Sequence, residues 1–282
     1  MPIDRHPADW KAVLHASLAG AEGNIHALVD GVHNEAFYQA LKKQARLRYL
    51  SLYATVPSAD EETLGLAPIL VQYDSAHSTQ WDTLMEFTNG KPALGIIVTA
   101  ESIEQVAARL IPWCVVDADG YSLALSFADT RILPALVDAL TPQQRGQFFG
   151  PALRWTYVAR DASWQGLPVD AAQALPAAQK VALSAAQVAA LMDASEADSI
   201  AFQFQQYLDK PLARYTADDA HALIGQWLRV ADRVKIEGNQ DRFALCAFGI
   251  ARPELLSDAR YLALLEPGTR PRSLDDTLAL LA

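Results

Sequence analysis

The sequence has few cysteines, and they lie far apart. Cys114 and Cys246 are the only two among 282 residues. Their separation excludes a CxxC redox motif or a zinc site built on closely spaced cysteines. Each cysteine lies in an apolar run, and free cysteine is among the most often buried residue types. The sequence therefore predicts two buried, reduced thiols.

Positive charge is also scarce. The chain has 23 Lys and Arg against 33 Asp and Glu, a formal net charge of −10 at pH 7. The acidity is spread over both halves, with no basic stripe and no acidic tail. A protein that binds nucleic acid normally shows a basic face, and an anionic lipid surface attracts basic segments. We therefore expect no nucleic-acid partner and no membrane partner.

Long apolar runs and nucleotide-binding or nucleophile motifs are missing as well. No apolar run approaches the roughly 20 residues that a bilayer-crossing helix needs. Met1–Asp9 is too polar for a signal peptide, so we expect a cytoplasmic protein. The chain has no G-x-x-x-x-G-K-[ST], G-x-G-x-x-G or G-x-S-x-G. No motif points to a cofactor, a metal ligand or a catalytic residue, although a triad of distant residues would leave no such mark.

Short apolar strands alternate with amphipathic helices through residues 1–164. Ile25–Val29 and Leu94–Val98 are typical of buried strands, and Asp119-Gly120 is a hairpin signal between two further strands. This alternation predicts an α/β lobe with a mixed sheet over residues 1–164.

The pattern changes after this lobe. Residues 165–182 are rich in Pro and Ala and have no clear period, so we interpret them as a linker. Residues 183–282 are predicted to form an all-α helical lobe. Phe202, Phe204 and Tyr207 do not fit one narrow helical stripe. One face of their helix could pack inward while another meets a partner helix; the alternative is a fully buried helix.

A set of short motifs occurs in order between residues 25 and 155. They are Ala27–Gly31 followed by Phe37-Tyr38, Ser51–Tyr53, Ala67–Val71, Gly95–Ile97, Ser102-Ile103, Phe127–Arg131, Thr141–Gln144 and Phe148–Pro151. None is specific alone. Together they resemble the type VI secretion adaptor, or effector-chaperone, family, whose domain was long catalogued only as one of unknown function. The variable helical second half also fits the usual layout of that family.

The central signature of this chain departs from the family pattern. The family usually has Arg-Phe-Tyr-Asp-Pro-Arg, whereas this chain has Ser126-Phe127-Ala128-Asp129-Thr130-Arg131. The first Arg, the Tyr and the Pro are absent, while Phe127, Asp129 and Arg131 remain. If the missing groups contact a partner, partner choice differs here.

The resemblance implies a non-enzymatic adaptor that binds a toxic effector and helps load it onto the VgrG spike. Such a protein is expected to be monomeric when free. The side chains that we expect at a partner surface are Asp129, Arg131, Phe148, Phe149 and Trp155, since aromatics and Arg are enriched at binding hot spots. The alternatives are an internal cap and salt bridge for Asp129 and Arg131, and core packing for the three aromatic residues.

Other residues of the matching blocks are expected to be structural: Asp30, Gly31, Phe127, Gly150 and Pro151. The alternative from a different functional class is a small-molecule enzyme with an α/β active site near Asp30 and Asp129, since strand ends are where such enzymes place their chemistry. A stable homo-oligomer is a third interpretation.

A metal site is the last alternative. His26, Asp30 and His33 lie close in sequence, and His26 and Asp30 would share a face of a strand. The Asp30-Gly31 turn is expected to remove His33 from that face, so we predict no metal.

Overall fold

The computed structural model describes residues 3–44, 46–207 and 212–266. Two compact units are present, Pro2–Ala194 and the chain from Ser195 onward. The last sixteen residues of the expected helical lobe, 267–282, lie outside the described residues. No helix in the described ranges is both long enough and apolar enough to cross a membrane.

A six-stranded sheet is the centre of the N-terminal unit. Its order is β2-β3-β1-β4-β7-β8, and every neighbouring pair is antiparallel. The strands are β1 (Asn24–Asp30), β2 (Tyr49–Ser51), β3 (Pro68–Gln72), β4 (Leu94–Thr99), β7 (Ala152–Val158) and β8 (Trp164–Gly166). The central strands β1, β3 and β4 are apolar almost throughout because both faces of the sheet are covered.

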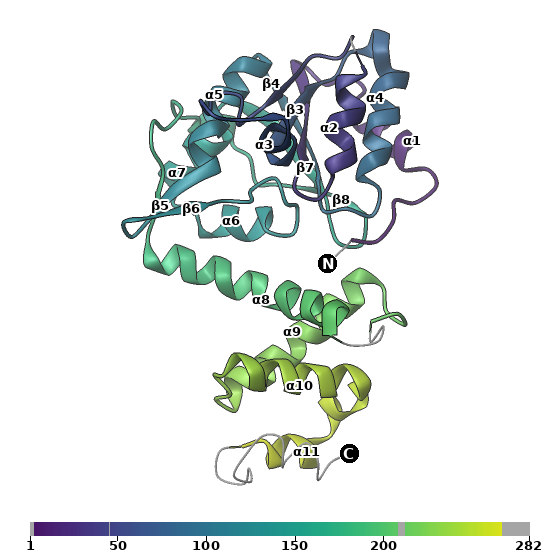
Figure 1. Ribbon diagram of the computed structural model, residues 1–282, viewed down its shortest axis with the longest axis vertical. Coiled ribbons are helices and arrows are strands. Elements are labelled where there is room, and N and C mark those ends of the chain that lie inside the picture. The colour runs from purple at the N-terminus through teal and green to yellow at the C-terminus, as the bar shows by residue number, and fades with distance from the viewer. Residues whose placement is uncertain (1–2, 45, 208–211, 267–282) are drawn as a thin grey trace. The chain divides into compact units, whose positions relative to one another are not determined.

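Alternation along the strands divides the core into two layers. Ala27 and Val29 point to the face covered by α1 (Trp10–Leu18), α2 (Glu35–Lys42) and α4 (Ser78–Met85). Leu28 points to the opposite face, covered by α5 (Ile103–Cys114), α6 (Leu133–Ala139) and α7 (Pro142–Phe149). Figure 1 shows the two helix groups on opposite sides of the sheet.

Short elements connect these layers. They are α3 (Glu61–Leu66) and the 3-10 turns η1 (Ser75–His77), η2 (Glu86–Thr88) and η3 (Ala171–Gln173). A second sheet has the order β6-β5-β9, from β5 (Val115–Ala118), β6 (Tyr121–Ala124) and β9 (Ala182–Leu183). The β5–β6 hairpin confirms the prediction from Asp119-Gly120, and the parallel β5–β9 pair makes this sheet mixed.

The segment expected to be a linker is packed against the N-terminal unit. Leu167 and Val169 lie against the core on the α5 side of the sheet, and Val181 is buried in it. The Leu175 amide donates to the Gly146 carbonyl at 3.0 Å. Along the chain, the boundary between the compact units falls after Ala194, inside α8 (Ala185–Tyr207), rather than in residues 165–182. Apolar side chains and backbone hydrogen bonds together hold this Pro- and Ala-rich segment on the core.

The C-terminal unit is helical. It contains the end of α8, α9 (Ala217–Arg233), α10 (Asn239–Ala251), the 3-10 turn η4 (Pro253–Ser257) and α11 (Ala259–Leu264). Phe204, Trp227, Leu245 and Tyr261 are among the buried side chains that form its own core. The predicted fold class is therefore confirmed: a unit of helices on a sheet, with a mixed sheet present, followed by an all-helical region.

Candidate functional site: a buried carboxylate cluster

Two aspartates that are far apart in the sequence are held close by one short backbone segment. Asp30 ends β1, and its amide donates to the Ala93 carbonyl at 3.0 Å. Asp129 lies in the loop before α6, and the next amide, Thr130, donates to the Pro92 carbonyl at 3.0 Å. Both loops are therefore fixed to the two consecutive carbonyls just before β4.

Gly31 sets the path of the chain after Asp30. A Cβ at this position would lie 2.0 Å from the Gly65 carbonyl oxygen, so only glycine allows this close approach. The turn that follows brings His33 back toward the strand end. The next residue, Asn34, fixes the turn because its side-chain amide donates to the Phe87 carbonyl and accepts from Lys91.

Asp129 and Arg131 form a buried ion pair. Nη2 of Arg131 lies 2.5 Å from Oδ2 of Asp129, and Nε lies 3.0 Å from Oδ1. The backbone amide of Arg131 also donates to Oδ1, at 2.9 Å. Burial by itself raises the pKa of Asp129, but hydrogen bonds from His33 and Arg131 outweigh it and hold the pKa well below its usual range.

Asp30 is only half satisfied. Its Oδ1 accepts from the Val32 amide at 3.0 Å. Its Oδ2 is buried and has no hydrogen-bond partner among the described residues. Burial raises the pKa of Asp30 to about 6, against the opposing effects of His33 and of the Val32 amide.

His33 lies between these groups. Its Nε2 is 3.0 Å from Oδ2 of Asp129, 3.0 Å from Nη2 of Arg131 and 4.0 Å from Oδ2 of Asp30. A guanidinium only donates and an ionised carboxylate only accepts, so one ring nitrogen cannot satisfy both neighbours at once. The His33 side chain is 33% exposed, so the cluster has one side open to solvent.

The structure brings together one pair of the residues expected at a partner surface. Asp129 and Arg131 form the internal salt bridge that was the alternative for them, and the carboxylate of Asp129 bonds the Arg131 amide rather than an amide within α6. Phe148, Phe149 and Trp155 are buried in the core, with Phe148 stacked on Trp155 at 5.0 Å between ring centroids. All five side chains are therefore engaged inside the N-terminal unit.

Three of the residues expected to be structural lie at or next to α7: Phe127, Gly150 and Pro151. Phe127 is fully buried and packs edge-on against Phe148. Gly150 ends α7 with a positive φ of 52°, and the carbonyl of Pro151, the next residue, faces the Thr99 hydroxyl at 3.5 Å. His26 does not join the cluster; its Nε2 faces the Glu101 carbonyl at 3.1 Å.

Sequence reasoning considered His33 but set it aside, and it missed the buried Arg109. The Asp30-Gly31 turn was expected to carry His33 away, yet the i, i+3 spacing from Asp30 returns it to the same strand end. Arg109 has no sequence signal, because a charged residue in an amphipathic helix is normally exposed. It is 8% exposed and bonds Glu101 and the carbonyls of Gln147 and Leu175.

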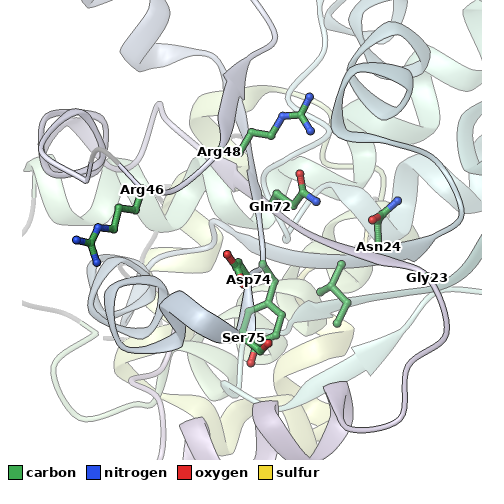
Figure 2. Close-up of a pocket in the computed structure, with 9 residues that line it drawn as sticks. Gly23, Asn24, Arg46, Arg48, Gln72, Asp74 and Ser75 are labelled. Atoms are coloured by element: carbon green, nitrogen blue, oxygen red, sulfur yellow. The ribbon is translucent and has the colours of Figure 1, made fainter.

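A surface cavity of about 510 Å³ lies elsewhere on the same unit. It is lined by Gly23, Asn24, Ile25, Arg46, Arg48, Gln72, Tyr73, Asp74 and Ser75. Figure 2 shows the guanidinium groups of Arg46 and Arg48 extending away from Asp74 and Ser75. Arg48 is moreover paired with Glu104. The cavity lacks convergent catalytic groups and does not include the carboxylate cluster.

Comparisons with known proteins bear on the N-terminal unit alone. No curated protein and no solved structure matches the chain. One family model, described as a domain of unknown function (DUF4123), matches residues 25–147. That stretch begins in β1 and ends in α7. The chain is therefore similar to DUF4123 over the part of the N-terminal unit that contains Asp30, His33, Asp129 and Arg131.

Proposed function

We propose that the protein is a non-enzymatic adaptor that binds a type VI secretion effector and helps load it onto the VgrG spike. The observation that carries the proposal is the match of residues 25–147 to DUF4123, a family associated with type VI secretion adaptors. The order of the sequence motifs within that range adds to it. The adaptor works by binding in the cytoplasm, without turnover, and is monomeric before it meets its cargo.

Surface properties of the described residues support a protein partner. Large apolar side chains are exposed in both units, among them Tyr121, Leu153, Met192, Phe202 and Tyr207. A specific complex buries on the order of 1,200 Å² or more, and exposed apolar side chains are what such a complex covers. The net charge of −10 favours a cargo with a basic face and faster association at low salt.

The test begins with the tagged full-length protein expressed in its native host under conditions where the secretion genes are active. The expected result is co-purification of a toxin-like effector, with VgrG in the same complex. The three purified proteins are then mixed, and size exclusion is expected to give a ternary complex that effector and VgrG alone do not form. If purified effector and adaptor do not associate, the adaptor function is wrong.

A second candidate function is a small-molecule enzyme centred on Asp30 and Asp129. The specific observation in its favour is the convergence of two carboxylates and an imidazole, with the pKa of Asp30 raised to about 6. A screen of hydrolysable metabolites separates the two functions. If the protein is an enzyme, the wild type turns over a metabolite and Asp30→Asn loses that turnover. If it is an adaptor, no metabolite is turned over and only formation of the ternary complex is observed.

A further inference from the structure

The two carboxylates of the cluster share one feature: Oδ1 of each accepts from the backbone amide two residues further along the chain. Oδ1 of Asp30 accepts from the Val32 amide, and Oδ1 of Asp129 accepts from the Arg131 amide. Each side chain is thus oriented by its own backbone turn. The second oxygen of each carboxylate, Oδ2, faces His33, and Oδ2 of Asp129 also accepts from the Arg131 guanidinium.

Three donor atoms of metal-ligand type therefore converge. Oδ2 of Asp30, Nε2 of His33 and Oδ2 of Asp129 all lie within 4.8 Å of one another. Ligands at about 2.0–2.2 Å from one tetrahedral Zn²⁺ ion lie roughly 3.3–3.6 Å from each other, so side-chain rotations must shorten the longer separations to bring these atoms into a coordination sphere. The Oδ1 bonds then act as the outer hydrogen bonds that hold a ligating carboxylate in place.

The orphaned oxygen of Asp30 is an independent sign that a cation belongs here. Asp30 is 3% exposed, and its Oδ2 has no hydrogen-bond donor among the described residues. A buried polar atom without a partner costs free energy, and native structures rarely retain one without a reason. The Arg131 guanidinium forms an ion pair with Asp129, but Oδ2 of Asp30 accepts no hydrogen bond from any of the described residues.

The guanidinium of Arg131 lies where a metal ion would bind, so the two cations compete for the same position. Its Nη2 lies 2.5 Å from Oδ2 of Asp129 and 3.0 Å from Nε2 of His33. A metal ion on these two atoms displaces Nη2, while Nε keeps its bond to Oδ1 of Asp129 at 3.0 Å. Without metal, the Arg131 guanidinium thus occupies the place of the ion. With metal bound, Arg131 hydrogen-bonds Asp129, one of the ligands.

We propose that Asp30, His33 and Asp129 form a binding site for a divalent transition-metal ion, with Zn²⁺ the best match. Imidazole nitrogen selects first-row transition metals over Mg²⁺ and Ca²⁺, and Zn²⁺ accepts mixed nitrogen and carboxylate ligands in a tetrahedral site. The fourth position faces the solvent-open side at His33, where a water molecule or a side chain of a bound protein completes the coordination. This inference is independent of the proposed adaptor function.

The test uses full-length protein stripped of metal with a chelator and titrated with Co²⁺, then with Zn²⁺. The expected result is one equivalent of Co²⁺ with visible absorption bands of tetrahedral coordination, which Zn²⁺ displaces. His33→Gln is expected to weaken Zn²⁺ binding at least 10-fold in calorimetry, and Asp30→Asn similarly. Arg131→Gln is expected to bind at least as tightly as the wild type, because it removes the competing cation.

A second His–Asp pair gives a matched control. His77 and Asp74 have the same i, i+3 spacing and an Nδ1–Oδ2 distance of 2.8 Å, but no third ligand accompanies them among the described residues. His77→Gln is expected to leave the titration unchanged. If Asp30→Asn does not fold, as judged by circular dichroism, His33→Gln carries the test because His33 is partly exposed. No stoichiometric uptake by the wild type, or equal affinity in His33→Gln, overturns the proposal.

Discussion

The guanidinium of Arg109 lies directly against the backbone of Gly150. A Cβ built at residue 150 would fall 2.1 Å from Cζ of Arg109, and the φ of Gly150 is +52°. The buried arginine bonds the Gln147 carbonyl near the end of α7 and the Leu175 carbonyl beyond β8, and it pairs with Glu101 before α5. Because residue 150 has no side chain, the Arg109 guanidinium fits at this corner and joins three segments of the N-terminal unit.

Gly150→Ala is therefore expected to destabilise the N-terminal unit by about 2–4 kcal/mol, because the methyl group meets a buried ion pair at a strained backbone position. Urea unfolding followed by circular dichroism measures the loss. Gly120→Ala is the matched control, since its φ is +86° but nothing lies within 4 Å of the added Cβ. It is expected to cost about 1 kcal/mol from backbone strain alone. Equal stability of the two variants would contradict the account.

Arg109→Met tests the other side of the same contact. It leaves the carboxylate of Glu101 unpaired in a largely buried position, with 13% of its side chain exposed, which costs about 3–5 kcal/mol. It also removes the donor to the Leu175 carbonyl, so amide hydrogen exchange is expected to accelerate in residues 171–175. In the control, Arg48→Met breaks a surface pair with Glu104 and is expected to cost about 1 kcal/mol or less. Unchanged exchange in residues 171–175 would show that Arg109 does not hold this segment.

The fold was predictable where local pattern and burial agree. The apolar strands Ile25–Val29 and Leu94–Val98 lie in the centre of the sheet, and the Asp119-Gly120 turn closes a hairpin, because each feature depends on neighbouring residues alone. The packing of residues 165–182 was not predictable. Pro and Ala dominate their composition, and only the tertiary structure shows that Leu167 and Val181 lie against the core.

The candidate site was predictable only in part. Asp30 and Asp129 were recognisable as strand-end and loop carboxylates, but their proximity depends on the carbonyls of Pro92 and Ala93, to which both loops bond. His33 was set aside because a turn was expected to direct it elsewhere. The direction of that turn is determined by the close approach of Gly31 to the Gly65 carbonyl, a contact between segments that no local pattern encodes.

Both cysteines are expected to be unreactive in the folded protein. Burial raises the pKa of the Cys114 thiol and of the Cys246 thiol to about 12. At pH 8 each is then a neutral thiol, and the thiolate is the nucleophile. Titration with a chromogenic disulfide reagent at pH 8 is expected to give almost no signal from native protein and two equivalents in denaturant. Rapid labelling of the native protein would show that at least one cysteine is accessible.

The helix α8 offers the clearest test of a cargo-binding surface in the proposed adaptor. Phe204 is fully buried in the C-terminal unit, whereas Phe202 is 54% exposed and Tyr207 is 76% exposed. Phe204 thus packs inward, whereas Phe202 and Tyr207, at different positions around the helix, expose aromatic groups of the kind that anchor protein interfaces.

Phe202→Ser combined with Tyr207→Ser is expected to weaken effector binding roughly 10- to 100-fold, because loss of aromatic anchors costs about 2 kcal/mol or more at an interface. The melting temperature is expected to change little, since neither side chain is in the core. Calorimetry with purified effector measures the affinity. The control, Leu153→Ser, changes an equally exposed apolar residue on β7, outside α8. If this control weakens binding and the α8 variant does not, cargo contacts the surface around β7 and the exposed aromatic residues of α8 have no part in recognition.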